Sequence, residues 1–161
     1  MLLRLFPKQA DNAYRGHWLG AALLAAVVLV KGLQGVVSVA MTAEIAQGAD
    51  GIDVSQFNAA GLADLMLSIA LIGFYIVAVN LIGAIVLIRW RALVPLMLLV
   101  ELVVQVGARV VIAAHPIPRL GAPEHGFAGQ PVGFYVNLAL LALTVLGLIL
   151  SLTGKRYRDA P

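Results

Sequence analysis

Four long apolar runs, joined by short polar connections, constrain this chain more than any other feature of its sequence. Each run is longer than the roughly 20 residues that a helix needs to cross a hydrocarbon layer about 30 Å thick. With 61% hydrophobic residues among 161 and a mean hydropathy of +0.97, the chain is too apolar for a soluble domain. We therefore predict an all-α, multi-pass integral membrane protein in which residues 1–161 form a single transmembrane domain. It is expected to be a four-helix bundle with spans at about 17–42, 63–89, 92–114 and 132–153.

The basic residues are divided unevenly between the ends of these runs. Most of the eleven lysines and arginines lie in the N-terminal segment, around Trp90 between the second and third runs, and in the C-terminal segment. The connection after the first run is acidic and has no basic residue. Because cytoplasmic loops carry an excess of Lys and Arg, we predict that both termini are cytoplasmic. The use of Arg over Lys, with much Ala, Val and Leu, indicates the cytoplasmic (inner) membrane of a bacterium with a GC-rich genome.

Three of the runs are interrupted by ionisable or strongly polar side chains. Lys31 lies in the first run, Asn80 in the second, and Glu101, Gln105 and Arg109 in the third. A charged group at the bilayer centre costs about 2.5–3.5 kcal/mol on insertion scales, so we expect these groups to face one another and not lipid. At about 1.5 Å per residue, Glu101 lies level with Asn80, and we expect Lys31 to neutralise Glu101. The sequence leaves the protonation of Glu101 open, because a paired carboxylate stays ionised whereas an unpaired one carries a proton.

The polar residues of each run share one face of a helix. Those of the third run recur at i, i+4, and those of the fourth run, Asn137, Thr144 and Ser151, are spaced by seven. In the first and second runs this face also carries small residues, among them Gly35 and Gly73. Small residues permit close helix approach, and polar side chains bridge helices in lipid. The sequence therefore predicts one interior cluster, whose binding or structural residues are Lys31, Gln34, Asn80, Glu101, Gln105, Arg109 and Asn137.

The connections predict part of the helix arrangement. The connection at Trp90 and Arg91 is tight, so the second and third helices are expected to be antiparallel neighbours, whereas the places of the first and fourth helices around them stay open. The loop 43–62 lacks strand alternation and the ligand series of a calcium loop, so we expect a solvated turn. The chain has no cysteine and no histidine at membrane depth. His115 and His125, in the last loop, could bind a metal but are expected to be solvated. We predict no metal site and no cofactor.

The pattern favours a non-enzymatic function, and it matches no diagnostic family motif. The preferred interpretation is a structural or accessory subunit, or an assembly partner, that contacts the lipid bilayer and either another membrane protein or itself as a homo-oligomer, and whose polar cluster sets helix register. The alternative is a proton-coupled, or a lipid- or small-molecule-binding or transport, protein that acts as an oligomer. An integral membrane enzyme, with Lys31 as a desolvated nucleophile, is less favoured, and no catalytic residue is assigned. No nucleic-acid partner is predicted.

Overall fold

The computed structural model describes residues 2–115 and 130–153, with side chains from residue 4 onward. The basic residues beyond 153, on which part of the topology prediction depends, lie outside the described residues. Two short helices, α1 (Leu2–Leu5) and α3 (Thr42–Glu44), accompany four long ones: α2 (Trp18–Ala40), α4 (Ala59–Arg89), α5 (Val94–Ala114) and α6 (Val132–Leu152). A 3-10 turn, Arg91–Leu93, leads into α5. The four long helices are long and apolar enough to span a membrane, as predicted.

Local chemistry sets the ends of these helices. The side chain of Asn58 accepts a hydrogen bond from Gly61 N at 2.8 Å and caps α4. Helix α4 therefore begins at Ala59, a turn before the apolar run that starts at 63. Pro95 lies in the first turn of α5, where a missing N–H removes no helical hydrogen bond.

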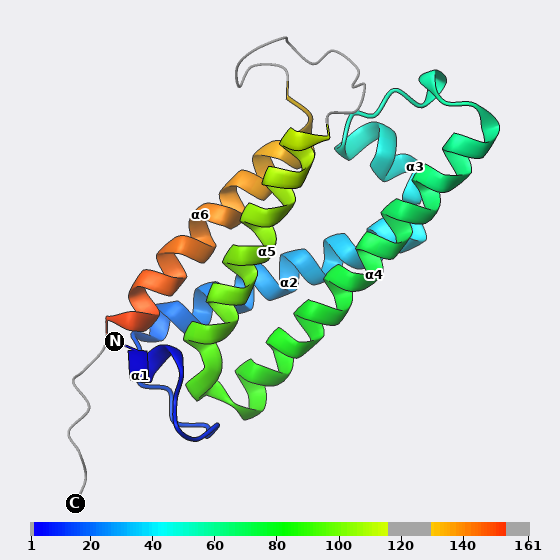
Figure 1. Cartoon of the computed structure of the whole chain (residues 1–161). Coiled ribbons are helices and arrows are strands. Elements are labelled where there is room, and N and C mark those ends of the chain that lie inside the picture. Colours follow the sequence, from blue (N-terminus) through cyan, green and yellow to red (C-terminus); the bar gives the residue numbers. More distant parts are fainter. Residues whose placement is uncertain (1, 116–129, 154–161) are drawn as a thin grey trace, which may run out of the picture.

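Successive long helices run in opposite directions. The pairs with the most extensive packing are not the pair that was predicted to be neighbours. Helix α2 packs most extensively against α4 and next against α6, and α5 packs mainly against α6. Figure 1 shows α4 and α5 meeting at their short connection and diverging from it. The prediction that these two helices are neighbours therefore holds near the connection and not along their length. A tight turn joins only the ends of two helices, and side-chain packing decides the rest.

Glycines explain why α4 packs on α2. A Cβ added to Gly35 would lie 2.8 Å from the backbone oxygen of Gly73, and one added to Gly73 would lie 2.8 Å from the Cβ of Ser38. Nearer the connection, a Cβ on Gly83 would lie 2.6 Å from Val28 on α2. Backbones that approach this closely gain van der Waals contact, the main source of helix association in lipid.

One half of the bundle has an apolar core, which we call the apolar plug. Its residues come from the first half of α2, the last turns of α4 and the first turns of α5, and all are buried. They are Leu24, Val28, Val86, Val94, Met97 and Leu98.

The N-terminal segment that precedes α2, residues 2–17, lies across this end of the bundle, and we call it the strap. Arg4 Nη1 donates a hydrogen bond to the oxygen of Leu152 at 2.6 Å, and His17 N donates to that of Leu150 at 3.2 Å. These donors bind carbonyls of the last turn of α6, and the oxygen of Leu150 also accepts a hydrogen bond from Thr153 N at 3.2 Å. The strap thus joins the start of α2 to the end of α6 at one end of the bundle. Within it, Arg15 donates a hydrogen bond to Asp11 and lowers the pKa of that carboxyl.

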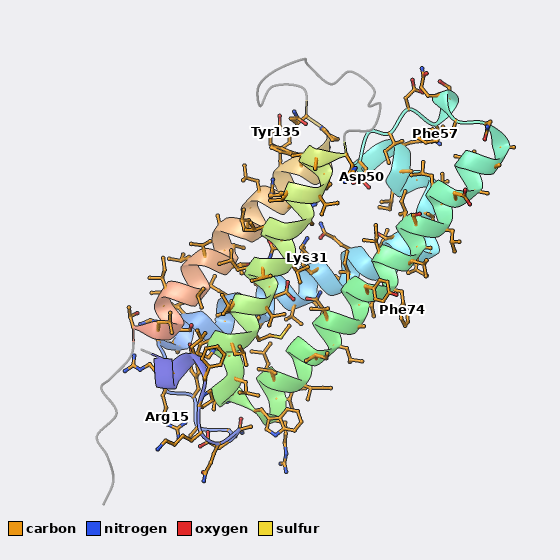
Figure 2. All side chains as sticks on the ribbon, in the orientation of Figure 1. Arg15, Lys31, Asp50, Phe57, Phe74 and Tyr135 are labelled. Atoms are coloured by element: carbon orange, nitrogen blue, oxygen red, sulfur yellow. The ribbon has the colours of Figure 1, made fainter. Side chains whose placement is uncertain are left out.

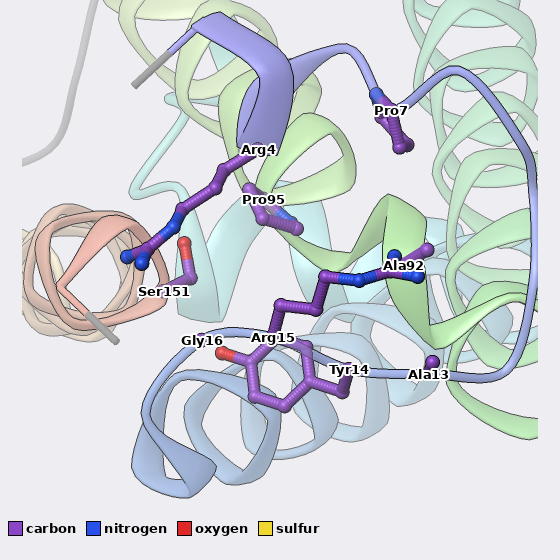
Figure 3. A pocket seen from close by; sticks show the side chains of 9 residues that line it. All are labelled: Arg4, Pro7, Ala13, Tyr14, Arg15, Gly16, Ala92, Pro95 and Ser151. Carbon is purple, nitrogen blue, oxygen red and sulfur yellow. The ribbon is translucent and has the colours of Figure 1, made fainter. Parts of the chain in front are cut away.

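A small pocket remains between the strap and the helix ends (Figure 3). Its volume is about 20 Å³, enough for roughly one water molecule. Tyr14 lies in its wall and donates a hydrogen bond to the oxygen of His17 at 2.9 Å. Burial raises the pKa of Tyr14 to about 12. The pocket lies between the strap and the helix ends, and it is too small for an organic ligand.

The connection between α2 and α4 is more ordered than the expected solvated turn. It contains α3, a π-helical turn (Ile45–Ala49) and a 3-10 turn (Val54–Gln56), and it buries Ala46 and Ile52. The first turn of α6 approaches it closely, because a Cβ on Gly133 would lie 2.6 Å from the backbone oxygen of Ala49. The loop is therefore folded and packs against α6.

The contact of α2 with α4 predicts a clear difference between two glycine substitutions. Gly35→Ala places a methyl group against backbone atoms of α4, which must shift, so we expect a loss of about 1–3 kcal/mol in unfolding free energy. Gly107→Ala on α5 meets nothing within 4 Å and should be neutral or stabilising by up to about 1 kcal/mol. Denaturant unfolding in detergent measures both. Equal stability of the two variants would contradict the close approach.

Candidate functional site

Helix α6 supplies partners for the polar side chains of two other helices. Lys31 Nζ on α2 donates a hydrogen bond to Asn137 Oδ1 at 2.5 Å. Gln105 Nε2 on α5 donates to Thr144 Oγ1 at 2.9 Å, and Thr144 is fully buried. Figure 2 shows Lys31 in the middle of the bundle. The two bonds join α2 and α5 to the same face of α6.

Lys31 and Glu101 influence each other electrostatically, but they do not form the direct ion pair expected from the sequence. Helix α2 lies between α4 and α6, and the ammonium group reaches α6, where Asn137 accepts its hydrogen bond. Glu101 on α5 is almost completely buried, at 2% exposure. Its carboxyl group is therefore attracted by Lys31 without touching it.

Asn80 and Glu101 lie at the same level of the bundle. Gly83 of α4 faces Met97 of α5, because a Cβ on Gly83 would lie 3.5 Å from Met97 Cε. Since the helices are antiparallel, one further turn along each brings the chain to Asn80 and Glu101. A Cβ on Gly32 of α2 would lie 3.7 Å from Asn80 Cβ, so α2 reaches this level too. The expected common depth agrees with this packing.

The hydrogen bonds determine which way the buried amides point. Asn80 Nδ2 donates to the backbone oxygen of Ile76 at 2.8 Å. Thr144 Oγ1 donates to the oxygen of Leu140 at 2.8 Å, so towards Gln105 it acts as the acceptor. Each amino group therefore uses one of its two hydrogens in these bonds, which leaves the amide oxygens, Asn80 Oδ1 and Gln105 Oε1, to other donors.

Three buried oxygens of the cluster have no hydrogen-bond donor. They are Asn80 Oδ1, Glu101 Oε1 and Gln105 Oε1, and each belongs to a residue at most 6% exposed. More than nine in ten buried polar groups in proteins have a partner, and an unpaired one costs about 1–3 kcal/mol. A water molecule or a proton on Glu101 would supply a donor to these oxygens.

Two further predicted residues lie at the edge of this cluster. The guanidinium carbon of Arg109 lies 5.5 Å from the ring centroid of Phe134 on α6, a cation–π distance, and its Nη2 is buried without a partner. Gln34 is half-buried and has no hydrogen bond to another described residue. Among the described residues, no three His, Cys, Asp or Glu side chains lie close enough to hold a metal ion.

The structure thus brings Lys31 together with Asn137. Glu101 lies one turn from Gln105 on α5, and Gln34 lies apart from both pairs. Thr144 is central to the cluster but is absent from the predicted site residues. Its spacing of seven from Asn137 was the signal for it, since both lie on one face of α6. No family model, curated protein or solved structure matches this chain.

The bond between Gln105 and Thr144 can be measured by a double-mutant cycle. Thr144→Val keeps the shape of the side chain but leaves Gln105 Nε2 without an acceptor, so we expect a loss of about 1–3 kcal/mol in unfolding free energy. Combining it with Gln105→Leu removes both partners and should recover part of that loss, with a coupling of about 0.5–2 kcal/mol. Unfolding in detergent gives the four values. Strict additivity would show that the bond contributes nothing.

Proposed function

We propose that this chain is an integral protein of a bacterial cytoplasmic membrane with both termini in the cytoplasm. The exposed faces of the four long helices support the location in a membrane, because they carry large apolar side chains such as Leu29 (64% exposed), Phe74 (60%) and Val103 (62%). Water would solvate such a surface poorly, whereas lipid covers it without cost. The strap, with its basic residues, lies at the end assigned to the cytoplasm.

The proposed topology predicts the sidedness of two exposed positions. The chain has no cysteine, so single cysteines can be labelled without a background. Asn12→Cys in the strap should react with a membrane-impermeant thiol reagent only from the cytoplasmic side, and Ser55→Cys in the 41–58 loop only from the opposite side. Whole cells and inverted vesicles provide the two sides. Labelling of both positions from the same side would refute the topology.

Within the membrane, the chain acts as a structural or accessory subunit, either with another membrane protein or as a homo-oligomer. The observation that carries this proposal is the use of the interior polar side chains to join helices to one another: Lys31 to Asn137 and Gln105 to Thr144. Polar bridges of this kind hold helices in register in lipid. A unit with a defined register offers fixed outer faces to a partner.

This role predicts an asymmetry between two leucine substitutions. Asn137→Leu leaves the ammonium group of Lys31 without its hydrogen-bond partner in an apolar layer, and the cost should approach the roughly 2.5–3.5 kcal/mol of an intramembrane charge. Lys31→Leu removes that charge and should cost less, and the double variant should resemble Lys31→Leu. Unfolding of the purified variants measures the stability, and native mass spectrometry from lipid nanodiscs measures the assembly state. A wild-type chain that is always monomeric and alone in its native membrane would contradict the subunit role.

A second function, binding or transport of a proton, a lipid or a small molecule, is favoured by a different observation. Three oxygens of the polar cluster are buried without donors, and a purely structural cluster would be expected to satisfy its own members. Intramembrane ionisable residues commonly mark such pathways. Glu101 would be the central residue of this site.

A further inference from the structure

The interior of the bundle is divided into two unlike halves. The half next to the strap contains the apolar plug, in which Leu24, Val94 and Leu98 are completely buried. The other half contains the polar cluster, which begins one turn beyond Met97, at Glu101. The change from apolar to polar therefore occurs within a single turn of α5.

Polar side chains continue along α5 from Glu101 in one direction only. Gln105, which is buried, and Arg109, which is half-buried, follow Glu101 on the side away from the strap. On the side towards the strap, Leu98, Met97 and Val94 are apolar and buried. A path for a proton that is lined by polar groups would therefore run past Gln105 and Arg109, and not through the plug.

The chemistry of the cluster selects the species that would be bound. Glu101 Oε1, Asn80 Oδ1 and Gln105 Oε1 are buried without a donor, so a partner for these oxygens must bring hydrogens; the fourth unpaired group, Arg109 Nη2, is itself a donor. A metal cation would add positive charge beside Lys31, which already acts on Glu101, and Arg109, which acts on Lys31. Helices α4 and α6 face the site with the uncharged Asn80 and Thr144. A proton needs no additional space, and it removes the buried negative charge.

We propose that Glu101 is a proton-binding site that exchanges its proton only with water at the end of the bundle where α5 ends and α6 begins. The proton passes from a hydronium ion to the carboxylate, leaving water, and returns by the reverse step. In the ionised form the carboxylate is held by the field of Lys31. In the protonated form its hydroxyl can donate to the free oxygen of Gln105, one turn away, or to that of Asn80. The proposal rests on membrane insertion and on the binding function, and not on the subunit function.

Cysteine accessibility tests the one-sided route in the full chain in membranes. Gln105→Cys should react with a small, charged, membrane-impermeant methanethiosulfonate from the side that labels Ser55→Cys, and not from the side that labels Asn12→Cys. Met97→Cys lies about 12 Å deeper, in the plug, and should react from neither side. Val104→Cys is the matched control, because it lies at the depth of Gln105 but on the outer face, 44% exposed. It should stay unlabelled in lipid.

The possible outcomes separate the two ideas involved. If Asn12→Cys and Ser55→Cys label from the same side, the proposed topology is wrong, and the route has no defined side. If those two behave as expected but Gln105→Cys stays unlabelled, or Val104→Cys or Met97→Cys labels equally fast, the route does not exist.

Infrared spectroscopy of the otherwise unmodified chain tests proton binding itself. Reconstituted wild-type protein should show the carbonyl stretch of a buried protonated carboxylic acid, which grows as the pH falls and shifts in D₂O. This band should vanish in Glu101→Gln and persist in Glu44→Gln, where the exposed loop carboxylate is replaced. A band that is unchanged in Glu101→Gln, or one that does not respond to pH while the protein is folded, would overturn the proposal.

Discussion

The architecture depends on one constraint: polar groups placed at mid-depth must find their partners within the bundle. Helix α6 meets this constraint for its neighbours. Asn137 accepts the hydrogen bond of Lys31, and Thr144 accepts that of Gln105. Lipid offers no alternative partner, so moving α6 by one turn relative to α2 and α5 would leave both donors unpaired. This penalty defines the register of three helices, although van der Waals packing supplies most of their contact.

Helix α2 is central to the packing because small residues on two of its faces permit close approach. Gly20 meets Ser151 of α6 near the strap, where an added Cβ would lie 3.0 Å from the Cβ of Ser151, and Gly35 meets Gly73 of α4 at the other end. Helix α4 therefore follows α2 and separates from α5, to which it is directly joined.

The sequence was sufficient to predict the helical class, the four apolar spans and the inward orientation of most polar residues. Apolar length and helical spacing are local properties, and the cost of a charge in hydrocarbon acts on each residue separately. The partners were not predictable to the same degree. Pairing Lys31 with Glu101 assumed that opposite charges meet, whereas α2 directs Lys31 towards α6 and Asn137. The packing of α4 depended on which glycine faces match, and the strap depended on carbonyls at the end of α6 that need donors. Both are relations between distant segments, which spacing within one helix does not encode.

The paired and unpaired groups of the cluster have different consequences. The bonds to α6 stabilise the bundle, whereas each unpaired oxygen near Glu101 lowers stability by about 1–3 kcal/mol. A proton on Glu101 would give one of these oxygens a donor, and it would remove the negative charge that attracts Lys31. Because Lys31 also holds α2 to α6 through Asn137, protonation of α5 would be felt at the α2–α6 contact. The Lys31–Asn137 hydrogen bond, which holds the helices in register, would thus be coupled to the protonation of Glu101. The stability of the bundle would then depend on the pH at one face of the membrane.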